Sequence, residues 1–156
     1  MKILSKEEVK IELDNILTYG ANDITIDIED VNLITKDKDL VVMGVYENSS
    51  DKAAYKIISS IISDFEDNEL SLMHIGGILV YFQISSSYNL MKLADAMDII
   101  DNKCDTAYIT DEPYVTFGTS CDDNLGIDYV KATVFMGYSK KENLKPANNF
   151  IDVSPL

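Results

Sequence analysis

The sequence predicts an α/β fold, specifically an α+β two-layer sandwich in which helices cover one face of a mixed four-stranded sheet. The expected elements follow the order β-α-β-α-β-β, because strand-length apolar runs alternate with segments whose apolar residues recur at helical spacing. Connections between parallel strands are right-handed, so two successive crossover helices lie on the same side of the sheet. Two further helices are expected before this core, the first of them at the N-terminus.

The N-terminal helix is expected from Ser5 to Gly20. Ser5 and Glu8 have the spacing of a capping box, and a glycine such as Gly20 can adopt the left-handed conformation that ends helices. Four apolar residues recur on one face of the segment: Val9, Leu13, Ile16 and Leu17. A short acidic link then leads to a second, brief helix, for which Asp27 is the expected N-cap and Thr35 the approximate end.

Two crossover units follow, and each combines an apolar strand with an amphipathic helix. The first strand is expected at 40–45, with a turn at 47–50 and a helix that carries an apolar stripe over 54–65. The second strand is expected at 77–84, and its helix runs from about residue 90 to 103. A connector then leads from Thr106 to Pro113.

Two more strands are expected, at 114–121 and 129–138. The second of them alternates between a face with Val130 and Val134 and a face with Lys131, which is typical of a strand with one face in the core. Because the turn between the two strands is short, we predict that they form an antiparallel hairpin.

Composition and charge exclude several classes of partner. The 156 residues are 46% hydrophobic and 26% charged, as in one globular domain with a core. The formal net charge of −14 repels phosphate backbones and anionic lipid, so neither nucleic acid nor a membrane is an expected partner. No apolar run approaches a bilayer span, and the N-terminus becomes acidic too early for a signal peptide. We therefore expect a cytoplasmic protein.

Cysteine and histidine give little basis for a metal site or for nucleophilic catalysis. Cys104 and Cys121 form no CxxC pattern, and His74 is the one histidine, so a zinc site would lack ligands. We expect two reduced thiols. A catalytic group could be built only around His74, which lies just before an apolar strand where a structural role is more common.

Five short motifs follow one another along the chain. They are ITIDIEDV at 24–31, LVVMGV at 40–45, ADAMDII at 94–100, FGTSCDDNLG at 117–126 and KATVFMGY at 131–138. In this order and spacing they resemble the C-terminal domain of FtsZ, the bacterial tubulin-like division GTPase family, and the first motif resembles the synergy loop of that family. The resemblance implies a domain at 24–139, preceded by an N-terminal helix and link at 1–23 and followed by a flexible tail at 140–156.

The resemblance also nominates site residues. In FtsZ proteins two aspartates of the synergy loop orient the water that attacks GTP on the next subunit, and their matches in this sequence are Asp27 and Asp30. The alternative is structural: Asp27 caps a helix while Glu29 and Asp30 favour its positive end. The sequence departs from the family at Thr25, where FtsZ proteins have asparagine, and it contains no G-G-G-T-G-T/S-G signature for GTP phosphates.

Three functions therefore stand as expectations. The first is a non-enzymatic interaction or regulatory module, in cell division or filament assembly, that docks onto FtsZ or an FtsZ-like protein. The second is the C-terminal part of an FtsZ-like GTPase whose Asp27 and Asp30 complete a GTPase site in trans. The third is a small-ligand-binding oligomeric module. We expect no metal or cofactor site on the chain itself, with GTP and Mg²⁺ implied only if it pairs with a GTP-binding domain. A second copy of the chain is a further possible partner. The sequence is compatible with a stand-alone gene product and with a part of a longer chain.

Overall fold

The computed structural model describes residues 2–16, 23–36, 38, 40–67, 75–107 and 114–138. Within these ranges the strands are β1 (Lys2–Leu4), β2 (Leu40–Ser49), β3 (Ile75–Ile84), β4 (Tyr114–Cys121) and β5 (Tyr129–Tyr138). The helices are α1 (Lys6–Ile16), α2 (Ile28–Thr35), α3 (Ala53–Asp67) and α4 (Leu90–Ala107). None of these helices is long and apolar enough to cross a membrane.

The strands form one mixed five-stranded sheet in the order β1-β2-β5-β3-β4. The prediction of four strands was wrong because β1, which pairs antiparallel with residues 41–43 of β2, is too short to show an alternating pattern. Strand β2 also continues through residues 47–49, where a turn was predicted, and pairs there with the start of β5.

The predicted hairpin of the last two strands was also wrong. Strand β4 pairs parallel with β3, and β5 pairs antiparallel with both β2 and β3, so β3 lies between β4 and β5. Nearly every side chain of β5 is buried, from Val130 to Tyr138, and Lys131 is only partly exposed. A strand with both faces buried belongs at the centre of a sheet, and a position beside β2 and β3 provides that cover.

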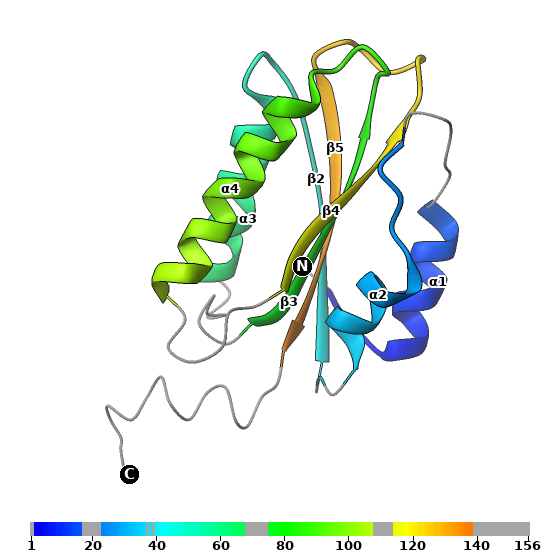
Figure 1. Cartoon of the computed structure of the whole chain (residues 1–156), viewed down its shortest axis with the longest axis vertical. Helices are drawn as coiled ribbons and strands as arrows, with labels where there is room; N and C mark the ends of the chain where they lie inside the picture. The colour runs from blue at the N-terminus through cyan, green and yellow to red at the C-terminus, as the bar shows by residue number, and fades with distance from the viewer. Residues whose placement is uncertain are drawn as a thin grey trace.

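Helices cover both faces of the sheet, so the prediction of helices on one face was wrong (Figure 1). The two crossover helices, α3 and α4, lie on the same face as expected and pack on Ile78, Val80 and Phe82 of β3. The alternate residues Leu79 and Tyr81 face the other way and are also fully buried, together with α1 and α2. Because each large apolar side chain gains roughly 1.5–3 kcal/mol on burial, the second apolar face requires its own helical layer.

The helix boundaries follow the predicted capping residues. The capping box of α1 is confirmed: the amide of Ser5 donates to the Glu8 carboxylate at 2.9 Å, and the amide of Glu8 donates to the Ser5 hydroxyl at 3.2 Å. Val9 and Leu13 are buried, as the predicted apolar face requires. Helix α4 continues to Ala107, two residues into the predicted connector. The predicted end of the first helix at 17–20 and the predicted tail at 140–156 lie outside the described residues.

Candidate functional site

The segment before α2, residues 23–27, is fastened to the edge strand β4. The amide of Ile24 donates to Oγ1 of Thr119 at 2.8 Å, and the amide of Thr119 donates to the carbonyl oxygen of Ile24 at 2.9 Å. The side chain of Ile26 is buried against Gly118, where a β-carbon would collide with it. Figure 1 shows this segment running beside β4 before it enters α2. The sequence motif FGT therefore includes the anchor point of the loop.

The reciprocal cap of α2 is formed by Asp27 and Asp30. The carboxylate of Asp27 accepts a hydrogen bond from the amide of Asp30 at 3.0 Å, and the Asp30 carboxylate accepts one from the amide of Asp27 at 3.1 Å. This arrangement satisfies two backbone donors that a helix start leaves unpaired, and both charges lie at the positive end of the helix dipole. The predicted N-cap at Asp27 is thus confirmed, while the predicted role of the two carboxylates in GTP hydrolysis stays a prediction.

The outer surface of this loop is acidic and apolar at once. Asp27 and Glu29 are exposed, Asp30 is partly exposed, and the Ile28 side chain between them is 62% exposed. A hollow of about 360 Å³ opens beside Ile28, between the start of α2 and α1. Its lining combines apolar side chains with charged ones at the rim: Lys10, Leu13, Asp14, Ile26, Asp27, Ile28 and Val31. Such a surface offers both a contact area and a charge pattern to another protein.

A second acidic loop lies where β4 ends. The amide of Ser86 donates to the Asp123 carboxylate at 3.0 Å and the Ser86 hydroxyl donates to it as well, which together lower the pKa of Asp123. Nearby, Cys121 is a free thiol, and burial together with the adjacent Asp23 raises its pKa. A thiol with a raised pKa is a poor nucleophile at neutral pH.

The remaining residues considered from the sequence form no catalytic or metal-binding group within the described residues. His74 and the side chain of Cys104 are outside the part of the chain that the structure describes. Across the described ranges, no three side chains of the metal-binding types His, Cys, Asp and Glu come together as a metal site. The two loop aspartates each use one carboxylate oxygen in the cap of α2. The expectations about GTP and Mg²⁺ therefore stay predictions.

Two features of the loop and of the groove between α3 and α4 were not predicted from the sequence. Thr119 was part of a recognised motif, but its hydrogen bonds to Ile24 join segments 95 residues apart, which no local pattern encodes. Tyr88 was not singled out, although it is buried and faces a groove between α3 and α4. The sequence signal for Tyr88 was a tyrosine, with an apolar ring and a polar hydroxyl, placed just before a predicted helix.

Comparison with known proteins relates the chain to one part of the FtsZ and TubZ proteins. No protein-family model matches the sequence. It is 25% identical over 122 residues to the cell division protein FtsZ of Helicobacter pylori, which covers 78% of this chain and 30% of that protein. The chain thus spans about a third of the length of its relatives.

Solved structures of FtsZ and TubZ share the fold of this chain. An FtsZ dimer from M. jannaschii superposes with a TM-score of 0.62 at 20% identity, covering 83% of this chain and 35% of that one. TubZ from GDP-form protofilaments of Bacillus thuringiensis serovar israelensis superposes with a TM-score of 0.54 at 14% identity, covering 92% of this chain and 39% of that one. The chain is similar in sequence to FtsZ over this region and shares the fold of the FtsZ and TubZ structures, consistent with the C-terminal domain of a tubulin/FtsZ-like protein.

Proposed function

We propose that this homologue of the FtsZ C-terminal domain is a non-catalytic interaction module that docks onto an FtsZ or FtsZ-like filament and influences its assembly in cell division. The docking surface is the loop face of α2, defined by Asp27, Ile28 and Glu29. The solved relatives include an FtsZ dimer and TubZ filaments, which supports assembly as the setting for such a domain. A homo-oligomer is the alternative partner.

The observation that carries the proposal is the fixed geometry of this loop. Its entry is fastened to β4 through Ile24 and Thr119, and its exit is fixed by the cap between Asp27 and Asp30. A preorganised loop loses little conformational entropy on binding, so its contacts count toward affinity. The loop leads into α2 with both of its ends held, so the Ile28 side chain, which is 62% exposed, offers an apolar contact in a fixed position.

The charge of the surface defines the chemistry of the partner. Exposed carboxylates flank Ile28, and the whole chain carries a net charge of −14. A complementary surface would offer Lys or Arg around an apolar recess that receives Ile28. Such complementarity accelerates association and weakens as salt screens it.

Co-sedimentation tests the proposal. The protein is mixed with GTP-assembled FtsZ from Helicobacter pylori and pelleted, and the filament mass and GTP turnover are followed. We expect co-pelleting that saturates and a change in filament mass or turnover. If the protein stays in the supernatant and leaves both quantities unchanged, the proposal is wrong.

A second candidate function rests on the spacing of the two carboxylates. The cap holds Asp27 and Asp30 close together at the outer end of α2, where they could face a nucleotide bound by another subunit. In this case the protein would complete a GTPase site in trans and speed phosphate release from a GTP-loaded FtsZ N-terminal domain. The two carboxylates would orient the attacking water, which is the role of a water-positioning residue in phosphoryl transfer.

Asparagine variants separate the two candidates without removing the cap. An Asn side chain still accepts the backbone hydrogen bond, so Asp27→Asn and Asp30→Asn are expected to keep the helix start while losing the charge. Stimulation of phosphate release that Asp30→Asn abolishes would favour the trans-acting function. The trans-acting function would be ruled out if Asp30→Asn stimulated phosphate release as well as the wild type does, or if the wild-type protein gave no stimulation. Docking would then be the function left to test.

A further inference from the structure

We propose that the groove between α3 and α4 binds a small monocarboxylate with an apolar, ring-containing body. The groove lies on the face of the sheet opposite α1 and α2, so the site is separate from the loop face of α2 (Figure 1). It has a volume of about 380 Å³, which is in the range of small-molecule sites.

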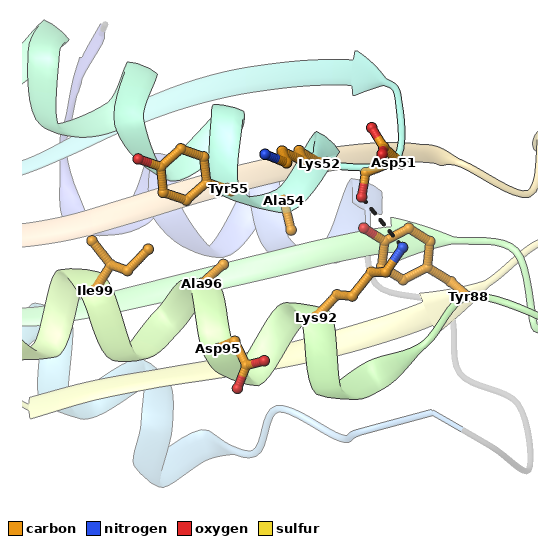
Figure 2. Close-up of a pocket in the computed structure, with 9 residues that line it drawn as sticks. All are labelled: Asp51, Lys52, Ala54, Tyr55, Tyr88, Lys92, Asp95, Ala96 and Ile99. Atoms are coloured by element: carbon orange, nitrogen blue, oxygen red, sulfur yellow. Dashed lines mark hydrogen bonds between the residues drawn. The ribbon is translucent and has the colours of Figure 1, made fainter.

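The site depends on Tyr88, in the turn that leads into α4. Its side chain is 7% exposed, and its hydroxyl has no hydrogen-bond partner among the described residues. Figure 2 shows the hydroxyl directed into the groove between the two helices. Leaving a buried hydroxyl unpaired is unfavourable, because the group has lost its water without gaining a partner.

The missing partner of this hydroxyl is an acceptor. Burial and the charge of Asp128 both raise the pKa of Tyr88, so the group keeps its proton at neutral pH. The backbone amide of Ala54 acts as a donor toward the hydroxyl oxygen and lowers the pKa of Tyr88. No acceptor for the hydroxyl proton lies among the described residues, and a carboxylate oxygen of the ligand would accept that hydrogen bond.

Two lysines supply positive charge to the lining of the groove. Lys92 places its Nζ 5.9 Å from the centre of the Tyr88 ring and donates to the carbonyl oxygen of Asp51 at 3.2 Å (Figure 2). Lys52, in the turn before α3, lines the groove as well. The hydrogen bond to the backbone holds the Lys92 ammonium beside the Tyr88 ring before a ligand binds.

Acidic side chains at the rim limit the charge that the site accepts. Asp51 and Asp95 line the groove together with Lys52 and Lys92, so the local formal charge is balanced on a chain that carries −14 overall. Attraction to the two ammonium groups and repulsion from the two carboxylates both scale with the ligand charge, so a phosphate dianion gains no net attraction that would offset its larger cost of desolvation. We therefore assign a monocarboxylate to the site and exclude a phosphate ester.

The rest of the groove is apolar and suits a ring. Its lining includes the small side chains of Ala54 and Ala96, which leave space between the helices, together with Ile99 and Tyr55. The Tyr55 side chain is 55% exposed and presents its ring to the groove in Figure 2. An aromatic body could stack against this ring, which adds to the apolar area that the ligand buries.

The test follows the backbone amide NMR signals of the full-length chain while one of two related ligands is added. The probe is 4-phenylbutyrate, and its neutral analogue 4-phenylbutyramide is the control ligand. We expect saturable shifts of the amides around Ala54, Tyr55 and Ala96 with the carboxylate, and about tenfold weaker binding of the amide, since hydrogen bonds to a charged group are the stronger ones. Tyr88→Phe and Lys92→Met should each weaken carboxylate binding by about tenfold, while Lys56→Met, an exposed lysine on α3 outside the groove, should leave it unchanged.

Several outcomes would overturn the assignment. These are the absence of saturable shifts with 4-phenylbutyrate, equal binding of the neutral analogue, or shifts that map to α1 and α2 instead of the groove. Equal losses in Lys56→Met and Lys92→Met would attribute the effect to net charge and would also overturn it. Filament docking through the loop face of α2 could still succeed or fail independently, because the two faces share no residue.

Discussion

Ile24 and Thr119 are joined by two hydrogen bonds of 2.8 and 2.9 Å, one from each backbone amide. The bonds connect the loop before α2 to an edge strand 95 residues later in the chain. The position of the acidic start of α2 therefore depends on β4. Substitutions that disturb β4 should also displace the proposed docking surface.

Gly118→Ala tests this dependence. A β-carbon at Gly118 would meet the Ile26 side chain and, at 2.9 Å, the carbonyl oxygen of Ile24. Because a backbone carbonyl cannot move aside cheaply, we expect a loss of about 1–3 kcal/mol in the free energy of unfolding, measured in urea. The matched control is Gly126→Ala, where the nearest atom would be at an ordinary 3.8 Å and the change should stay within about 0.5 kcal/mol. Equal effects of the two substitutions would contradict the close fit between the loop and β4.

The cap of α2 predicts a difference between two substitutions at one position. Asp27→Ala removes the acceptor for the Asp30 amide and should cost about 1 kcal/mol of unfolding free energy, whereas Asp27→Asn keeps an acceptor and should cost a few tenths at most. Thermal or urea unfolding of both variants measures the difference. A loss from Asp27→Asn as large as that from Asp27→Ala would mean that the charge, and not the hydrogen bond, stabilises the helix start.

Tyr88→Phe should leave the protein at least as stable as the wild type. The substitution removes a buried hydroxyl that has no partner among the described residues and keeps the ring that packs in the core. Urea unfolding without ligand measures this. A loss of about 1 kcal/mol or more would show that the hydroxyl has a structural hydrogen bond, and the assignment of a ligand acceptor would lose its basis.

The pH dependence of stability includes a contribution from Asp123. Hydrogen bonds from Ser86 lower its pKa in the folded state, so the carboxylate stabilises the fold above its ordinary pKa of 3.8. That contribution is lost as the pH falls through the lower, folded-state value. Ser86→Ala removes the hydroxyl donor, so the pKa of Asp123 should rise toward its ordinary value in a carbon-13 NMR titration. The stability difference between Ser86→Ala and wild type should be present at neutral pH and should shrink in acid; an unchanged pKa would contradict the hydrogen-bond explanation.

Much of the fold could be predicted from local pattern. Helix spacing identified α3 and α4, and strand-length apolar runs identified most of the sheet, because burial imposes those periods directly. The double apolar pattern of β3, with Val80 on one face and Tyr81 on the other, also contained the information for two helical layers. Right-handed crossovers place α3 and α4 on one face of the sheet, but they do not determine the face that α1 and α2 cover.

Other features depend on contacts between distant segments and could not be predicted. Strand β1 has three residues and is a strand only because β2 pairs with it. The insertion of β5 between β2 and β3 depends on pairing with both, although its uninterrupted apolar character was a signal for a central strand. For the site, the Asp27 cap followed from the sequence, whereas the returning hydrogen bond from the Asp27 amide to Asp30 and the bridge between Ile24 and Thr119 required the structure.

The most direct test of the proposed docking function compares two equally exposed apolar residues on opposite faces. Ile28 is 62% exposed at the loop face of α2, and Met91 is 64% exposed at the start of α4. Fluorescently labelled protein is titrated with GTP-assembled FtsZ filaments from Helicobacter pylori, and anisotropy reports binding. We predict saturable binding by the wild type, a loss of at least about tenfold in affinity for Ile28→Asp, and little change for Met91→Asp. Binding that is absent in the wild type, or that Met91→Asp weakens as much as Ile28→Asp does, would contradict docking through this face.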